Sequence, residues 1–327
     1  MSIISTLIPD RFVLMLMLTI LVAALLPVSG VAAVYAGHAV SVSIFFLFFL
    51  HGLRLPRAEV LVAMRNWRLQ AIMFAFVFAF MPLLAFGAAS AQGGLIAGGL
   101  PQGLVVGLLF LGILPSTVQS AISYSSLAGG NIAASVMASA LLNLAGIFMT
   151  PLLVALLIGA SGGAAIGSDT VLRIVAILLL PFALGQMAQG WLGAWAVRNK
   201  PMLTLLDRTA IILAVYVAFS SAVAGGQMQA LDWRVLGVLT AIICAMLAIA
   251  FVSAWALGGI IGLSRADRIS LLFAGSHKSI ATGAPLAAIL FTGPLAGLAI
   301  LPALIYHQIQ LIVSAPLAAK LAKGQDG

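Results

Sequence analysis

Long apolar segments alternate with short polar segments along the whole chain. Each apolar segment has roughly the 20 residues that a helix needs to cross the hydrocarbon layer of a bilayer. The pattern therefore predicts an all-α membrane protein with about ten transmembrane helices. The predicted helices lie at about 12–28, 31–53, 69–88, 100–127, 131–159, 171–191, 207–227, 235–261, 268–291 and 294–319.

The composition agrees with a single polytopic membrane domain over residues 1–327. Hydrophobic residues make up 63% of the sequence and charged residues only 7%, whereas about a quarter of the residues are charged in a soluble domain. The lone Cys244 excludes an internal disulfide and a cysteine-based metal site. We expect the lipid bilayer as the environment, no nucleic-acid partner and no cofactor. Both a monomer and a homodimer agree with the sequence.

The positive charges predict the orientation of the helices. Of the 15 lysine and arginine residues, only Arg173 and Arg234 fall in predicted outer loops, and Lys278 falls inside a helix. The other twelve fall on the opposite side, together with both ends of the chain. Because loops rich in lysine and arginine stay in the cytoplasm, we expect a cytoplasmic (inner) membrane protein with both termini in the cytoplasm.

The helices divide into two groups of five. The first group begins near residue 12 and the second near residue 171. Because five is an odd number, the second group would cross the membrane in the inverted sense. Inverted repeats are the ground plan of many secondary transporters. A chance likeness between two groups of helices is the alternative.

Two segments in equivalent helices of the repeats are predicted to be interrupted. In the fourth helix, Pro115 removes a main-chain donor within Leu114–Ser120, which is otherwise rich in polar residues. In the ninth helix, Gly275–Pro285 combines glycine, proline and polar residues. Interrupted helices free main-chain donors and acceptors for a bound solute, so we expect the binding site here. Kinks that only serve helix packing are the alternative.

Lys278 lies in the second of these segments. It follows Arg268 by ten residues, which is about 15 Å along a helix and places it near the bilayer midplane. All seven acidic residues fall in loops or at helix ends: Asp10, Glu59, Asp169, Asp207, Asp232, Asp267 and Asp326. An anionic substrate is therefore the expected partner of Lys278, and its removal should not lower stability. The alternatives are a lysine that extends to the membrane surface and a lysine that is uncharged because burial lowers its pKa.

Enzyme classes are disfavoured by residue type. Zinc and di-iron sites need clusters of carboxylate, histidine or cysteine ligands, and no suitable spacing occurs. A serine hydrolase would need an acid to complete its triad. His38, His277 and His307 are expected to pack against neighbouring helices rather than to carry protons. A channel stays the main rival of a transporter, because paired half-helices also line pores.

The sequence resembles the bile acid:sodium symporter family (solute carrier family 10), closest to its bacterial and member-7-like branch. The likeness extends over nearly the whole chain. It includes Phe45–Leu53, Met81–Leu83, Leu114–Tyr124, Gly130–Asn131, His277–Ser279 and Tyr306–Gln308. It implies ten helices in two inverted repeats, in which the fourth and ninth helices break and cross. It also implies panel helices at about 12–53 and 171–227, and core helices at about 69–159 and 235–319.

The resemblance also implies site residues. Candidate sodium ligands are Gln119, Ser120, Ser135 and Ser139, with Ser276 where the better-known branch has a glutamate. Val77 stands where that branch has a glutamine ligand, so the second sodium site is in doubt. Candidate substrate-binding residues are Thr117, Lys278, Ser279, His307 and Gln308, whereas Ala281 stands where that branch has an asparagine.

We therefore expect a secondary transporter, not an enzyme. The expected substrate is a small organic anion such as a bile acid, a steroid conjugate or an organic acid, carried by alternating access. Sodium is the candidate coupling ion. The alternative function is a non-coupled channel or a membrane regulatory protein on a transporter scaffold.

Overall fold

The structure, a computed structural model, describes residues 11–54, 67–96, 98–158, 168–291 and 293–323. These residues form helices and connecting turns, with no strand among them. The first group of helices is α2 (Arg11–Leu25), α3 (Gly30–Arg54), α5 (Trp67–Ala75), η2 (Phe76–Phe80), α6 (Met81–Ala91), η3 (Gln92–Gly94), α7 (Gln102–Ile113), α8 (Gln119–Leu127), α9 (Ile132–Leu153) and η4 (Val154–Ile158).

The second group of helices begins with the long helix α10. It consists of α10 (Ser168–Arg198), α11 (Lys200–Ala224), η5 (Gln227–Ala230), α12 (Trp233–Ile260), α13 (Arg265–Ser276), α14 (Ile280–Leu290) and α15 (Leu295–Lys323). Within the described ranges, 7 helical segments are long and apolar enough to cross a membrane. An all-α, multi-pass membrane protein is thus confirmed, and ten spans in inverted repeats stay a prediction.

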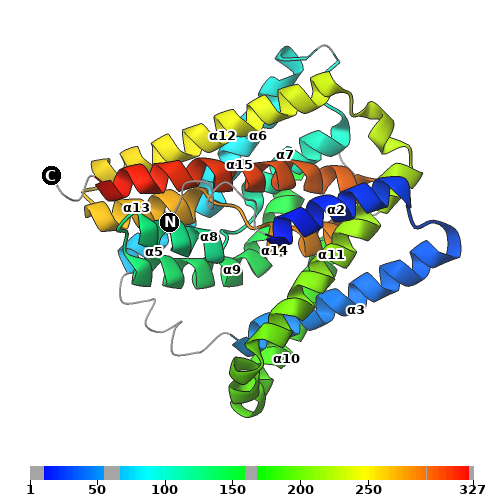
Figure 1. Cartoon of the computed structure of the whole chain (residues 1–327), viewed down its shortest axis with the longest axis horizontal. Helices are drawn as coiled ribbons and strands as arrows, with labels where there is room; N and C mark the ends of the chain where they lie inside the picture. Colours follow the sequence, from blue (N-terminus) through cyan, green and yellow to red (C-terminus); the bar gives the residue numbers. More distant parts are fainter. Residues whose placement is uncertain (1–10, 55–66, 97, 159–167, 292, 324–327) are drawn as a thin grey trace.

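The helices form a bundle with an arm (Figure 1). In the bundle, α7 packs against α6 and α15, and α12 packs against α13. The arm consists of α3, α10 and α11, and it extends below the bundle in Figure 1. α3 packs along α10, while α11 packs against α2 and α3 on one side and against α14 and α15 on the other. α11 is therefore a principal connection between the arm and the bundle.

The two outer helices of the arm approach each other closely because glycine lies at their crossing. A Cβ atom at Gly52 would overlap the carbonyl of Phe182, and a Cβ atom at Gly185 would overlap the carbonyl of Phe49. Gln186 Nε2 donates to the carbonyl of Gly52 at the same place. Small residues allow this kind of main-chain approach between membrane helices.

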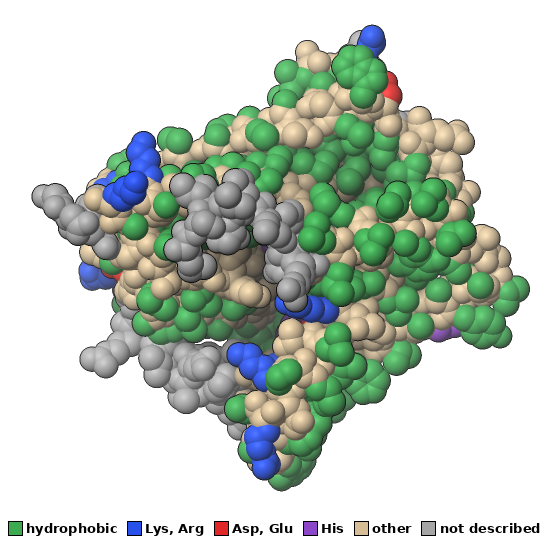
Figure 2. Space-filling view, in the orientation of Figure 1, with side chains coloured by type: hydrophobic (Ala, Val, Ile, Leu, Met, Phe, Trp, Pro, Cys, Tyr) green, Lys and Arg blue, Asp and Glu red, His purple; other side chains and the backbone are tan. Residues whose placement is uncertain are grey.

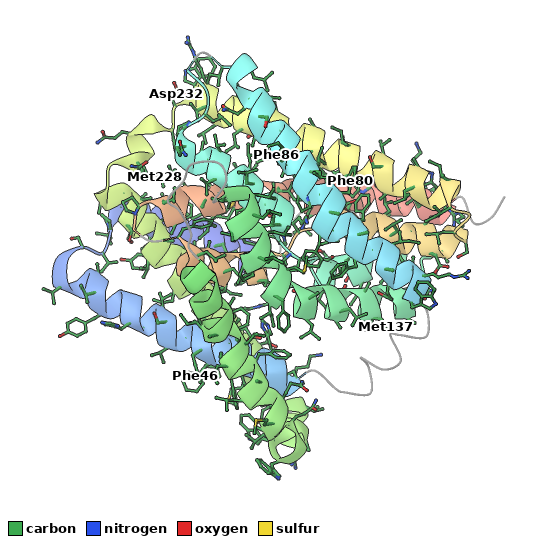
Figure 3. The ribbon with its side chains drawn as sticks, turned by 180° about the vertical axis from the view of Figure 1, so that it is seen from behind. Phe46, Phe80, Phe86, Met137, Met228 and Asp232 are labelled. Carbon is green, nitrogen blue, oxygen red and sulfur yellow. The ribbon has the colours of Figure 1, made fainter. Side chains whose placement is uncertain are left out.

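Figure 3 shows the molecule from behind. The arm, with Phe46 on α3, lies apart from η2 and α6, which carry Phe80 and Phe86.

The structure differs from the predicted boundaries between the sixth and seventh helices. The sequence pattern leaves 192–206 as a loop, but α10 continues to Arg198 and α11 begins at Lys200. Pro201 lies in the first turn of α11, where the missing N–H needs no partner. Only Asn199 separates the two helices, and residues 192–198 at the end of α10 are apolar apart from Arg198. The fourth and ninth predicted helices are each divided into two helices, as described below.

The surface is largely apolar, and its charges gather at the ends of the helices (Figure 2). Trp191 on α10 and Tyr35 on α3 have exposed fractions of 85% and 71%, which suits contact with lipid. Lysine and arginine side chains gather at the left end of the bundle and along the arm in Figure 2.

Candidate transport site

The two interrupted helices meet inside the bundle. α7 ends at Ile113 and α8 begins at Gln119, and in the second interruption α13 ends at Ser276 and α14 begins at Ile280. The main-chain N–H of Ser279 donates to the carbonyl of Pro115 at 3.0 Å. The interruptions predicted at Pro115 and at Gly275–Pro285 are therefore present, and they are hydrogen-bonded to each other.

Every carbonyl of residues 112–116, at the end of α7 and just beyond it, accepts a hydrogen bond from outside that segment. These groups have no continuing helix to pair with, and unpaired carbonyls are costly away from water. Lys278 Nζ donates to the carbonyls of Gly112 (2.8 Å) and Leu114 (2.7 Å). The carbonyl of Ile113 accepts from Thr150 Oγ1 (3.0 Å), that of Pro115 from Ser279 N (3.0 Å) and that of Ser116 from Asn143 Nδ2 (2.8 Å).

Lys278 is the charged residue of this crossing. Its side chain is 1% exposed, and its ammonium also lies 3.4 Å from the carbonyl of Val77 in η2. The three contacts of Nζ are all main-chain carbonyl oxygens. Lys278 does not extend to a surface, and in this structure its hydrogens are donated to the protein. Direct pairing of Lys278 with a substrate stays a prediction.

Gln310 on α15 holds the main chain of Lys278. Its Oε1 accepts from the N–H of Lys278 at 2.9 Å, and its Nε2 donates to the carbonyl of Lys278 at 3.2 Å. The same Nε2 lies 2.9 Å from His307 Nδ1. The hydroxyl of Tyr306 donates to the carbonyl of Ser276 at 2.7 Å. α15 therefore pairs the freed groups of the second interruption.

Asn143 on α9 connects the two interruptions from the other side. Its Nδ2 donates to the carbonyl of Ser116, and its Oδ1 accepts from the hydroxyl of Thr282 at 2.9 Å. The N–H of Thr282 in turn donates to Ser279 Oγ, which caps the N-terminus of α14. Gly146 lies one turn further along α9, and a Cβ atom there would lie 2.9 Å from Pro115.

The N-termini of the two inner helices differ in exposure. α8 begins without a side-chain cap, and Val118 and Gln119 at its start are exposed. α14 is capped by Ser279, and Ala281 in its first turn is exposed. Helix N-termini carry partial positive charge and free N–H groups. The uncapped start of α8 is therefore the more available of the two for an anion.

Four of the five candidate substrate-binding residues, Thr117, Lys278, Ser279 and His307, lie at the crossing, whereas Gln308 contacts α2 instead. Thr117 and Ser279 are buried beside the crossing, and His307 and Gln308 are partly exposed. His307 Nδ1 lies 3.3 Å from the carbonyl of Lys278. Gln308 Nε2 lies 3.9 Å from the sulfur of Met17 on α2, so Gln308 connects α15 to α2.

The candidate sodium ligands are placed less uniformly. Ser120 Oγ lies 3.1 Å from His277 Nδ1, and the hydroxyl of Ser135 donates to Ser125. The hydroxyls of Ser139 and Ser276 are buried without a hydrogen-bond partner. These oxygens suit a hard cation, although no carboxylate accompanies them among the described hydrogen bonds. Gln119 is exposed. His277 also lies 2.8 Å from Ser314 Oγ through Nε2, which agrees with its expected packing role.

Sequence reasoning missed Asn143, Thr150 and Gln310. Each is an isolated polar residue in a long apolar helix, and such residues are common at helix contacts in membranes. Asn143 and Gln310 could have been found in the same way as Lys278, because a polar side chain inside a membrane helix needs a partner.

The sequence model of the SBF-like CPA transporter family matches residues 10–323. The chain belongs to this family. Among its relatives, an uncharacterized protein of Pseudomonas aeruginosa is 42% identical over 318 residues, which is 97% of this chain and 94% of that protein. The putative symporter YfeH of Escherichia coli is 38% identical over 95% of this chain and 92% of its own length.

A more distant relative carries a more specific name. Sodium/bile acid cotransporter 7 of Rattus norvegicus is 26% identical over 83% of this chain and 79% of its own length. The resemblance seen in the sequence is therefore confirmed, and this member of the SBF-like CPA transporter family is a transporter rather than an enzyme.

Proposed function

We propose that this chain is a secondary carrier of a small organic anion in the cytoplasmic membrane, with both termini in the cytoplasm. The observation that carries the proposal is the meeting of the two interruptions around Lys278, a buried side chain whose Nζ contacts only main-chain carbonyls and which precedes the start of α14 by two residues. The partial charges of the two helix C-termini and the two helix N-termini at the crossing offset one another, so the charge of Lys278 leaves the crossing positive as a whole. A positive site in a low-dielectric surrounding favours anions over cations.

The first contacts of the anion are assigned to the start of α8. This start has no side-chain cap, Val118 and Gln119 are exposed there, and helix N-termini bind carboxylates and sulfates. Lys278 attracts the anion electrostatically over a longer distance and makes no direct hydrogen bond to it. Thr117 and Ser279 position the two helix starts, and His307 and Gln308 line the side that faces α2.

The substrate class follows from the apolar surroundings and from the names of relatives. A bile acid, a steroid conjugate or a comparable organic acid combines one anionic group with an apolar body. The apolar body suits the exposed Val118 and Ala281 beside the helix starts. The name of sodium/bile acid cotransporter 7 supports this class.

Alternating access is assigned to movement between a panel and a core. We assign α2, α3, α10 and α11 to the panel and the bundle to the core. At the end of the molecule where α11 ends, the two are tightly packed: a Cβ atom at Gly297 on α15 would lie 2.7 Å from the carbonyl of Ala218. Toward the opposite ends of α3 and α10, the arm diverges from the bundle (Figure 1). With the proposed orientation, we assign this packing to the state closed to the outside.

The test is ligand-dependent thermal unfolding of the purified protein in detergent. Taurocholate, estrone sulfate and benzoate are the anionic probes, and tetraethylammonium is the cationic control, each in sodium chloride and in N-methyl-D-glucamine chloride. At least one anion should raise the unfolding temperature in a saturable manner, because a ligand that binds the folded state stabilises it. A rise with tetraethylammonium but with none of the anions would contradict the proposal.

A further inference from the structure

The three carbonyls around the Lys278 ammonium come from two separate places in the chain. Gly112 and Leu114 lie at the end of α7, at 2.8 and 2.7 Å from Nζ, and Val77 lies in η2 at 3.4 Å. All of the atoms lie in the buried interior of the bundle, since Lys278 is 1% exposed. The set is therefore enclosed and is composed of oxygen atoms only.

The chain leaves each of these carbonyls free of its usual helical donor. Gly112 and Leu114 lie at the end of a helix, beyond which no N–H continues the series. In η2 the N–H of Met81 donates to the carbonyl of Phe76, five residues earlier. The next donor in this π-helical series would be residue 82, which is a proline without an N–H. Val77 is thereby available to Lys278.

Main-chain carbonyls at the end of a half-helix are also the ligands that bind sodium ions in membrane proteins. A helix C-terminus carries partial negative charge, which a single positive charge offsets. We propose that the carbonyls of Val77, Gly112 and Leu114 form a monovalent-cation site that the protein fills with its own lysine. The Lys278 ammonium is a covalently tethered cation, and a free ion from solution is not needed at this position.

The proposal predicts a latent site for small cations. When the side chain is shortened, the carbonyls stay in place and lose their donor. Sodium or methylammonium can then enter the space that the ammonium occupied. The cation site does not rest on the proposed transport function, because its occupancy is read from stability alone.

The experiment measures the unfolding temperature of full-length Lys278→Ala in detergent. The three buffers contain sodium chloride, methylammonium chloride or N-methyl-D-glucamine chloride at equal ionic strength. Sodium or methylammonium should raise the unfolding temperature of Lys278→Ala by several degrees over N-methyl-D-glucamine, and the rise should saturate. Lys278→Met fills the space with an apolar chain and should show no such difference. Lys200→Ala, at an exposed lysine, should behave as the wild type does.

The outcomes separate clearly. Recovery of folded Lys278→Ala only from sodium or methylammonium buffers would support the proposal as well. Equal unfolding temperatures of Lys278→Ala in all three salts would overturn it. The same cation response in Lys278→Met, or a failure to recover Lys278→Ala from any of the buffers, would also overturn it.

One consequence does rest on the proposed function. If the chain carries an organic anion, wild-type uptake should need no sodium ion at this position. Absence of any uptake would count against the carrier, while the result of the stability experiment would still decide the cation site.

Discussion

The main-chain N–H of Ser279 donates to the carbonyl of Pro115 across the meeting point of two interrupted helices, at 3.0 Å. Neither partner could make this bond if its helix were continuous, because both groups would pair within their own helix. The bond fixes the starts of α8 and α14 relative to each other. A ligand that binds at these two helix starts therefore binds to a main chain that is already held in position.

Replacement of Asn143 by leucine should destabilise the protein, because Asn143 pairs with Ser116 and Thr282 on the two interruptions. We expect a loss of about 1 to 3 kcal/mol, the cost of leaving a buried polar group unpaired. Thr282→Val removes only one of these contacts and should cost less. Thr240→Val is the control, since its hydroxyl bonds only within its own helix. Thermal unfolding measures all of them, and equal stabilities for Asn143→Leu and the control would contradict this role.

Gln310 and Gln308 provide a matched pair on one helix. Gln310→Leu leaves the N–H and the carbonyl of Lys278 without their amide partner, so its stability should fall by about 1 to 3 kcal/mol. Gln308→Leu loses only a weak contact to Met17, and its stability should be unchanged. In transport, however, Gln308→Leu should raise KM, because Gln308 is assigned to the lining of the site. A larger loss of stability in Gln308→Leu than in Gln310→Leu would reverse the assignment.

Much of this site follows from the sequence, and the reasons for the rest are physical. The interruptions could be predicted, since Pro115 and the glycines near Lys278 act on their own main chain. The partners of Lys278 could not. They are main-chain carbonyls of Val77, Gly112 and Leu114, and any residue type can supply a carbonyl. The stability effect expected for Lys278 also changes, because removing an ammonium that pairs three freed carbonyls should lower stability.

The fold, like the site, has features that the sequence predicts and features that it does not. The all-α class and the approximate helix positions follow from hydropathy, which reports how each segment interacts with the membrane. The close crossing of α3 and α10 at Gly52 and Gly185 depends on which faces meet, and that information is spread over both helices. The predicted sixth helix ends at 191, whereas α10 continues to Arg198 through a stretch that is apolar apart from this arginine.

A substitution at Gly297 can test whether the tight contact between α15 and α11 closes the site to the outside. In Gly297→Val, the new Cβ would meet the carbonyl of Ala218 and the Cβ of Ala222, both at 2.7 Å. We expect loss of uptake and increased labelling of Ala222→Cys by an impermeant maleimide from outside, in a Cys244→Ser background. Gly237→Val is the control, because nothing lies within 4 Å of a Cβ there. Unchanged labelling of Ala222→Cys in Gly297→Val would show that this contact does not gate access.

The orientation can be tested with two exposed positions at opposite helix ends. Lys200 lies at the start of α11 and Trp233 at the start of α12, and both are exposed. In the Cys244→Ser background and in intact cells, an impermeant maleimide should label Trp233→Cys and not Lys200→Cys, because lysine and arginine favour the cytoplasmic side. The reverse labelling pattern would place the termini outside.

The most direct test of the central claim is counterflow of an organic anion in proteoliposomes. Vesicles loaded with unlabelled taurocholate, or with whichever anion stabilises the protein, are diluted into a trace of the labelled compound. In N-methyl-D-glucamine buffer without sodium, a carrier should accumulate the label transiently and saturably, and the accumulation should be lost in Lys278→Ala and kept in Lys200→Ala. Flux that rises linearly with concentration and shows no transient accumulation, or counterflow that is equally fast in Lys278→Ala, would contradict the account.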